Sequence, residues 1–147
     1  KILKLLQEDA RKPLSEISSK IHLSLPAVSE RLKKIEQSGV VRSFTAILEP
    51  EKFHKNLCAY CLIILKNKDI DGDPRLQAFL DQEDDILECC CLTGDYEYLV
   101  KIRTESTKTL EELLAKMRRE VPILKATTSV VLSIKKEKVS ILPSNGK

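Results

Sequence analysis

The sequence predicts an α+β protein, in which a three-helix, winged-helix-like helix-turn-helix domain precedes a ferredoxin-like βαββαβ domain. The first third of the chain carries apolar residues at helical spacing, and from residue 57 onward strand-like and helical runs alternate. The 147 residues are 42% hydrophobic and 32% charged, a balance typical of globular proteins. We expect a helix-turn-helix domain at 1–40, a connector with an extended segment at 41–56, a ferredoxin-like domain at 57–136, and a frayed tail at 137–147.

Two helices are predicted before the turn of the motif. The first runs from Lys1 to about Asp9 and places on one face Ile2, Leu5, Leu6 and Ala10. Pro13 suits the start of the second helix, and Glu16 in its first turn suits the helix dipole. On one side of this second helix lie Leu14, Ile17 and Ile21. His22 and Leu23 form the turn that follows.

The third helix has a start signal, a stop signal and a buried stripe. Ser24 is the expected N-cap, Pro26 lies in the first turn, and Gly39 ends the helix. The apolar stripe consists of Val28, Leu32 and Ile35, which are spaced to pack on the first two helices. Such a capped second helix of a helix-turn-helix is the part that enters the DNA major groove.

The remaining elements alternate. Residues 40–48 read as an extended segment, which could pair with a second copy of the chain. Strands are expected at about 57–66, 86–93, 97–103 and 126–135. A loop with Gly72 and Pro74 leads to a helix carrying Leu76, Phe79 and Leu80. The longer second helix of this domain carries Leu110, Leu113, Leu114, Met117 and Val121.

The basic excess is confined to the first third of the chain. Residues 1–56 contain 11 Lys and Arg against 7 Asp and Glu, a net charge of +4, whereas residues 57–147 contain 14 against 15, a net of −1. This distribution is expected if the first domain meets phosphates, although solvated helix faces can also be basic.

The candidate DNA-binding residues lie on and beside the third helix. We expect Ser29, Glu30 and Lys33 to face bases, because they oppose the apolar stripe, and Arg31, Lys34 and Arg42 to contact phosphates. Ser24 and Pro26 complete this predicted surface at the start of the helix. The alternative for each residue is an ordinary solvated helix face.

The second candidate site is the segment CLTGDYEYLVK, residues 91–101. Gly94-Asp95 is a tight-turn signal between two strands, and the plain interpretation is a hairpin turn alone. The functional interpretation is a small-molecule site, in which Asp95 holds an ammonium group and the turn amides hold a carboxylate. The predicted effector-binding residues are Gly94, Asp95, Tyr96, Thr127, Thr128 and Ser129, the last three at the opening of the final strand.

Enzymatic and metal-binding patterns are poor. Along a strand, neighbouring residues such as Cys89, Cys90 and Cys91 point to alternate faces, and Cys58 and Cys61, three positions apart, also point to opposite faces. These cysteines cannot converge on one ion, so we expect no metal site and interpret them as small apolar residues. His22 and His54 have no nucleophile–base arrangement around them, and we expect no enzyme. The acidic run Glu83-Asp84-Asp85 reads as a solvated helix end. No apolar run approaches about 18 residues, and the chain shows no signal peptide, so we expect no membrane association and a reducing cytoplasm.

Over nearly its whole length the chain resembles the Lrp/AsnC family, the leucine-responsive and asparagine-synthesis regulators of bacteria and archaea. The resemblance is carried by KILKLLQEDAR, LSLPAVSERLKKIEQSGVVRSFTAIL, LTGDYEYLVK and VPILKATTSVVL. It implies a transcription regulator that binds double-stranded DNA, self-associates into dimers and then tetramers or octamers, and binds an amino acid near Gly94-Asp95 and Thr127 to Ser129. No cofactor is implied beyond that amino-acid effector.

Two positions depart from the family pattern. Ile123 stands where the family often has Gly, and Lys125-Ala126 replaces a commonly polar or acidic position, so the choice of ligand or its binding is open. The leading hypothesis is a sequence-specific DNA-binding regulator whose assembly or DNA affinity responds to a small molecule. The alternatives are an architectural DNA-binding protein without a ligand response, and a tetrapyrrole decarboxylase of similar fold, which would require His and Arg around its substrate.

Overall fold

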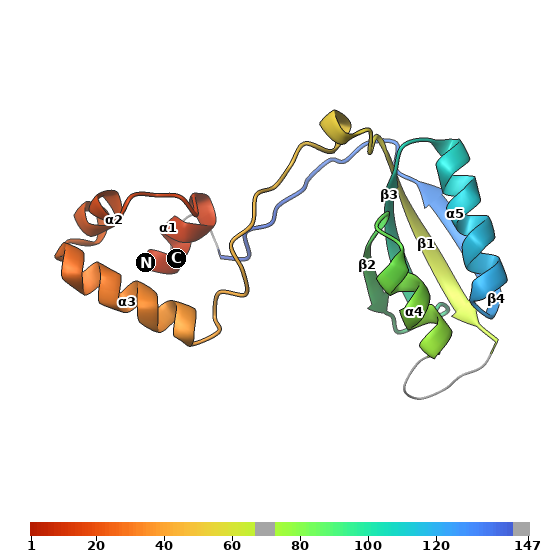
Figure 1. The fold of residues 1–147 in the computed structure, drawn as a ribbon, viewed down its shortest axis with the longest axis horizontal. Helices are drawn as coiled ribbons and strands as arrows, with labels where there is room; N and C mark the ends of the chain where they lie inside the picture. Colours follow the sequence, from red (N-terminus) through yellow and green to blue (C-terminus); the bar gives the residue numbers. More distant parts are fainter. Residues whose placement is uncertain (67–72, 143–147) are drawn as a thin grey trace. The chain divides into compact units, whose positions relative to one another are not determined.

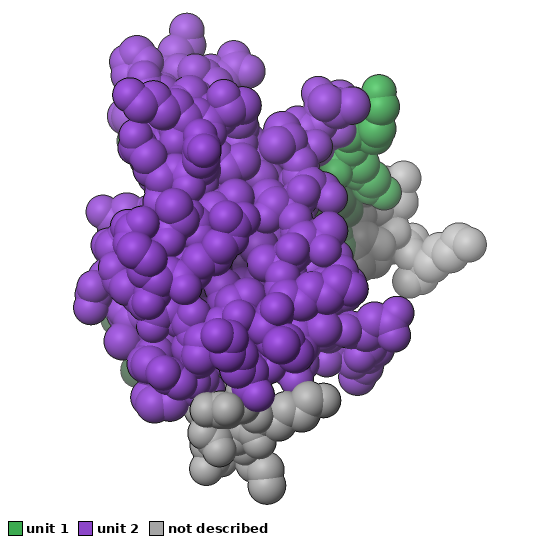
Figure 2. All heavy atoms as spheres, turned by 90° about the vertical axis from the view of Figure 1, so that its right-hand side faces the viewer, with its two compact units in different colours: residues 1–47, 135–147 green, residues 48–134 purple. Residues whose placement is uncertain are grey.

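The computed structural model describes residues 1–66 and 73–142 and divides the chain into two compact units. The first unit comprises Lys1–Ile47 with Lys135–Lys147, and the second comprises Leu48–Ile134 (Figure 2). Gly72 of the predicted loop and residues 143–147 of the predicted tail lie outside the described residues. No helix in the described ranges combines the length and the apolar character needed to cross a bilayer.

The first unit is a three-helix bundle of α1 (Ile2–Glu8), α2 (Leu14–Ile21) and α3 (Leu25–Gln37) (Figure 1). One residue from each helix forms the buried centre: Ile2, Ile17 and Val28. Around them pack Leu5, Leu6, Ile21, Leu23, Leu32 and Ile35, as the periodicity predicts. The spacing also predicts Ala10 and Leu14 in this core. Ala10 is exposed because α1 ends at Glu8 and the helical spacing no longer applies to it, and Leu14, the first residue of α2, is 42% exposed.

Capping fixes the ends of the two helices of the motif. The side chain of Ser24 accepts a hydrogen bond from the Ala27 amide at 3.4 Å, and the prediction of Ser24 as N-cap is confirmed. His22 ends α2 in the left-handed region at φ 56°, and Gly39 follows α3 at φ 70°. Gly39 therefore ends α3 as predicted, because a left-handed φ costs a residue without Cβ little.

The connector contains one helical turn that its sequence does not predict. The 3₁₀ helix η1 spans Pro50–Phe53, where the ring of Pro50 presets the first φ and His54 ends the turn at φ 56°. Residues 40–49 form no helix or strand, and Phe44, Ile47 and Leu48 are each more than half exposed. Pairing of this extended segment with a second copy stays a prediction.

The described part of the tail is held by α1 rather than frayed. The side-chain oxygen of Gln7 accepts hydrogen bonds from the backbone amide of Leu142 at 3.0 Å and from the hydroxyl of Ser140 at 3.2 Å. A backbone amide paired in this way has exchanged its water partner for the protein, which holds the segment against the first unit.

The second unit is a four-stranded antiparallel sheet with two helices. Its strands are β1 (Leu57–Leu65), β2 (Ile86–Cys91), β3 (Tyr98–Thr104) and β4 (Ile123–Val130), in the order β2-β3-β1-β4 (Figure 1). Helix α4 (Pro74–Gln82) follows β1, and α5 (Thr107–Glu120) follows β3. The predicted ferredoxin-like order of elements is thereby confirmed, with Pro74 as the first residue of α4 rather than in the preceding loop.

Helices α4 and α5 cover one face of this sheet. Strand β1 sends Ala59, Cys61, Ile63 and Leu65 into the core, where they pack with side chains of β3 and of both helices. The helices contribute Leu76, Phe79, Leu110, Leu113 and Met117. The opposite face, which we call the open face, carries the alternate residues of β1 and the residues paired with them, including Tyr60, Leu62 and Leu99.

Strand β4 begins and ends earlier than predicted. The pattern of residues predicts this strand at 126–135, but it spans Ile123–Val130. Its length follows from its partner, because Ile123 pairs with Leu65 at the end of β1 and Val130 pairs with Ala59 near its start. Thr127 therefore lies within the strand and not at its opening.

Two further interpretations of the second unit need correction. The acidic run is not simply solvated, because Glu83 forms an ion pair with Lys116 of α5, and Asp85 forms one with Lys55. Among the cysteines, Cys58 and Cys61 are buried as predicted, but Cys91 is exposed because it lies at the end of the edge strand β2.

Candidate functional site

The outer face of α3 presents polar and charged side chains to solvent. Because each helical residue advances by about 100°, Pro26, Glu30 and Lys33 project opposite the buried Val28. Among the predicted DNA-binding residues only Ser29 is half-buried. The others are exposed: Ser24, Pro26, Glu30, Arg31, Lys33, Lys34 and Arg42. The arrangement leaves one continuous face of the helix free to contact another molecule.

An ion pair links two neighbouring turns of this face. The ammonium of Lys34 lies 2.7 Å from a carboxylate oxygen of Glu30, and this contact lowers the pKa of the Glu30 carboxyl below its usual value. Both side chains are largely exposed, so solvent screens their attraction and the pair adds little to stability. Lys34 is therefore free to exchange Glu30 for another anion at small cost.

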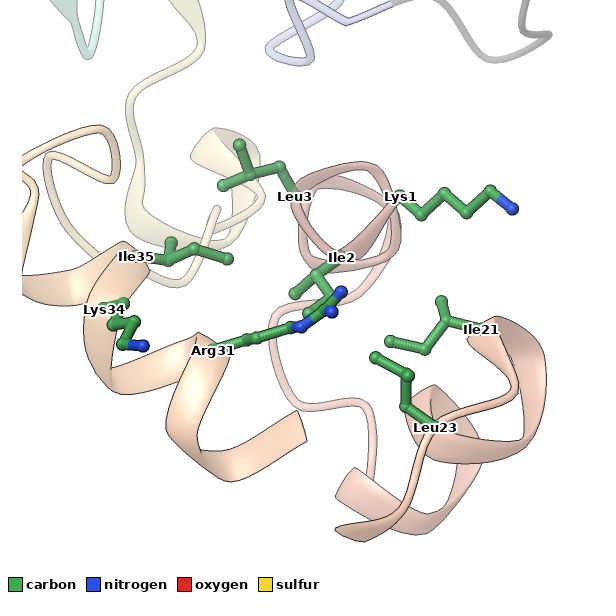
Figure 3. A pocket seen from close by; sticks show the side chains of 8 residues that line it. All are labelled: Lys1, Ile2, Leu3, Ile21, Leu23, Arg31, Lys34 and Ile35. Carbon is green, nitrogen blue, oxygen red and sulfur yellow. The ribbon is translucent and has the colours of Figure 1, made fainter. Parts of the chain in front are cut away.

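Arg31 lies on the flank of α3 rather than on its outermost ridge. It follows Val28 by three positions, so its side chain leaves the helix only about 60° from the buried stripe. There it borders a pocket of about 540 Å³ between α1, the turn after α2, and α3 (Figure 3). The pocket is lined by Lys1, Ile2, Leu3, Ile21, Leu23, Arg31, Lys34 and Ile35.

The loop between β2 and β3 is closed by backbone and carboxylate hydrogen bonds. The Leu92 amide donates to the Glu97 carbonyl at 2.8 Å, and the Glu97 carboxylate accepts from the Leu65 amide at 2.8 Å. Gly94 has φ 111°, which a residue with a Cβ rarely adopts, so the turn depends on glycine. Glu97 thus has a structural role at the end of β1, whereas Asp95 projects from the turn and is exposed.

Beside this turn the structure brings together three side chains from two segments. The Tyr96 hydroxyl lies 2.8 Å from the Thr127 hydroxyl, and the Lys125 ammonium lies 5.0 Å from the centre of the Tyr96 ring. The hydrogen bond with Thr127, supported by Lys125, lowers the pKa of the Tyr96 phenol because both partners stabilise the phenolate. These contacts join the β2–β3 loop to the open face of β4.

The two threonines of the predicted site point in opposite directions. Thr128 pairs with the buried Cys61, and its hydroxyl donates to the Cys61 sulfur at 3.3 Å on the helix-covered face. Thr127 and Ser129 pair with Leu62 and Tyr60 on the open face and are exposed. The structure therefore separates Thr128 from Tyr96 and Thr127.

Lys125 lies over the Tyr96 ring but is not among the predicted effector-binding residues, since in the sequence it stands out only as a departure from a family pattern. Lys125 pairs with Ile64 and lies on the same face as Thr127, two positions along β4. The alternation of side chains along a strand groups Lys125 with Thr127 and places Thr128 on the other face.

The histidines have a backbone role in this structure. His22 and His54 each end a helical turn at φ 56°, in the left-handed region. Over residues 1–66 and 73–142, no three His, Cys, Asp or Glu side chains are grouped so that they could hold a metal ion.

Comparison with known families matches both units of the chain. A model described as Winged helix-turn-helix DNA-binding matches residues 1–42, and a model described as Lrp/AsnC ligand binding domain matches residues 58–141. The HTH-type transcriptional regulator FL11 of Pyrococcus abyssi is 36% identical over 138 residues, which cover 93% of this chain and 89% of the relative. The leucine-responsive regulatory protein of Salmonella typhimurium is 28% identical over 89% of this chain and 80% of its own length.

Solved structures of two similar proteins contain L-methionine. A transcriptional regulator of Neisseria meningitidis in complex with L-Met superposes with a TM-score of 0.89 at 29% identity, covering 98% of this chain and 93% of that one. A feast or famine regulatory protein from M. tuberculosis, complexed with L-methionine, superposes with a TM-score of 0.84 at 26% identity, covering 96% of this chain and 94% of that one.

Proposed function

The chain belongs to the Lrp/AsnC family of transcriptional regulators, and from this membership we propose that α3 reads operator DNA while the second unit binds an amino acid that controls the response. The observation that carries the DNA assignment is the exposed face of α3, which is capped at Ser24 and bordered by Arg31 and Lys34. Side chains of such a helix reach base edges, and flanking cations contact phosphates. The same membership leads us to expect a cytoplasmic protein that acts without catalysis.

Salt dependence tests the placement of DNA on the basic first unit. A dimer that makes about six to eight phosphate contacts should lose affinity with a slope of about −5 to −7 in log K against log salt. Fluorescence anisotropy with a labelled operator fragment, selected from a random DNA pool, measures this slope. A flat response would contradict the proposal.

The proposed effector site consists of the Gly94 turn, Asp95, Tyr96, Lys125 and Thr127, with Ser129 beside them. Asp95 supplies a carboxylate for an α-ammonium group, and backbone amides of the turn can hold a carboxylate. Relatives of this fold bind L-methionine, which supports an amino acid as the class of ligand. Binding would favour one assembly over another, and DNA affinity would shift by the difference.

Thermal-shift screening against the twenty amino acids, followed by Asp95→Asn, tests the effector site. A bound amino acid at one hundred times its dissociation constant stabilises the fold by about 2.7 kcal/mol. Asp95→Asn should abolish this shift and leave affinity for DNA without effector unchanged. If Asp95→Asn abolished DNA binding and preserved the thermal shift, the proposed division of labour would be wrong.

The proposed dimer surface is the part of the open face formed by β1 and β3, which leaves the proposed effector residues of β4 to the ligand. Tyr60, Leu62 and Leu99 lie there half-buried, and no helix of the described chain covers them. Burial of such apolar area drives association, and we propose that dimers formed here stack further into tetramers or octamers. Sedimentation velocity should show Leu62→Lys as monomeric, whereas Leu14→Lys, on an exposed leucine of the first unit, should assemble as the unchanged protein does.

A further inference from the structure

The proposed effector site holds two opposite charges, and no charged side chain of residues 1–66 or 73–142 forms an ion pair with either of them. These charges are Asp95 and Lys125, which are both exposed. The carboxylate of Glu97, the other acidic residue of the turn, accepts a hydrogen bond from the Leu65 amide. The charges available to a ligand are therefore one carboxylate, one ammonium and the partial positive charge of the turn amides.

Lys125 is held at this site rather than pointing freely into solvent. Its ammonium lies 5.0 Å from the centre of the Tyr96 ring, within the range of a cation–π contact. Tyr96 is in turn held by its hydrogen bond to Thr127 at 2.8 Å. The two strand positions, 125 and 127, project on the same face of β4, so the ammonium and the Thr127 hydroxyl border one surface.

A monocarboxylic amino acid leaves this set of charges incompletely matched. Its α-ammonium pairs with Asp95 and its α-carboxylate with the turn amides, but an apolar side chain placed against Lys125 would remove water from an ammonium and offer no partner. A second carboxylate supplies that partner. A basic side chain would meet Lys125 as a like charge and be repelled.

We propose that the effector is a dicarboxylic amino acid, L-glutamate or L-aspartate, and that Lys125 selects it by pairing with the side-chain carboxylate. This inference rests on the proposed effector site and adds the ligand's chemical class and the residue that determines it. The side-chain carboxylate lies between the Lys125 ammonium and the Thr127 hydroxyl, both of which can donate hydrogen bonds to it.

Isothermal titration calorimetry with L-glutamate, L-aspartate, L-methionine and L-lysine tests the inference on the full chain. The unchanged protein should bind L-glutamate or L-aspartate at least tenfold more tightly than L-methionine. Lys125→Met, which keeps the length of the side chain, should weaken that binding by about tenfold or more, because a charge-assisted hydrogen bond is lost. Lys125→Arg should retain it, and Lys125→Glu should favour L-lysine.

Lys108→Met is the matched control, because Lys108 is an exposed lysine in the first turn of α5, at the end of the sheet away from Gly94. Its affinities should equal those of the unchanged protein, and circular dichroism checks that every variant folds. If L-methionine bound more tightly than either dicarboxylic amino acid, the inference would be overturned and the proposed function would stand. The same conclusion would follow if Lys125→Met left the affinity for L-glutamate unchanged. Absence of binding to any amino acid would overturn the proposed effector site itself, and the inference with it.

Discussion

The hydroxyl of Tyr96 lies 2.8 Å from the hydroxyl of Thr127, across 31 positions of sequence. The contact fixes the loop after β2 against the open face of β4, next to Asp95 and Lys125. It also distinguishes Thr127 from its neighbour Thr128, whose hydroxyl reaches the Cys61 sulfur on the covered face of the sheet. Two neighbouring residues of β4 therefore face opposite sides of the sheet, one at the proposed effector site and the other toward the core.

This alternation predicts different outcomes for two equivalent substitutions. Thr127→Val should weaken effector binding several-fold and raise the pKa of Tyr96, because the phenolate loses a hydrogen-bond donor. Thr128→Val should leave effector affinity unchanged and alter stability by less than about 1 kcal/mol, since a weak O–H···S contact is replaced by a methyl of similar size. Calorimetry and NMR titration of isotope-labelled tyrosine measure both. Equal loss of binding in the two variants would argue against the assigned faces.

Two adjacent lysines of α3 should affect DNA binding differently. Lys33 projects opposite the buried stripe. Lys33→Ala should therefore reduce the discrimination between bases at one operator position by about 1–3 kcal/mol of binding free energy. Lys34 lies beside Glu30 on the flank of the helix. Lys34→Ala should therefore weaken binding to all operator sequences alike and make the slope of log K against log salt shallower by about 1. Binding to a panel of single-base operator variants at several salt concentrations separates the two effects. A uniform loss on Lys33→Ala would instead assign Lys33 to the phosphates.

The N-cap of α3 should contribute measurably to the stability of the first unit. Ser24→Ala removes the acceptor for the Ala27 amide and should cost about 1 kcal/mol, with a lower melting temperature. Ser19→Ala, at an exposed position inside α2, is the matched control and should be nearly neutral or slightly stabilising. Thermal and urea unfolding followed by circular dichroism compares them. If both variants behaved alike, the cap would have no energetic role.

The three consecutive cysteines should differ in reactivity. Burial raises the pKa of the Cys89 thiol to about 11, so at pH 8 only about one molecule in a thousand carries its thiolate. Cys91 is exposed and should be alkylated first, whereas Cys89 should react appreciably only as the pH approaches 11. Mass spectrometry of iodoacetamide-treated protein at pH 8 and pH 10 follows each site, with denatured protein as the reference. Equal rates for Cys89 and Cys91 in the folded chain at pH 8 would contradict this order.

The local elements and their order follow from the amino-acid sequence alone. Ser24 and Gly39 mark the ends of α3 because capping and left-handed backbone depend on the residue at that position, and Val28, Leu32 and Ile35 mark its buried side by spacing alone. The alternating elements after residue 57 likewise specify the βαββαβ order. Side-chain direction along a strand was also readable, and applying it to β4 would have separated Thr127 from Thr128.

The pairing of strands, the bounds of β4 and the meeting of distant side chains depend instead on how the whole chain folds. The bounds of β4 depend on the length of β1, because a strand persists only while its partner supplies hydrogen bonds. The positions of Lys125 over Tyr96 and of Lys116 beside Glu83 likewise depend on contacts between segments far apart in the chain. Such contacts arise from packing of the whole sheet and its helices, and no local pattern of residues specifies them.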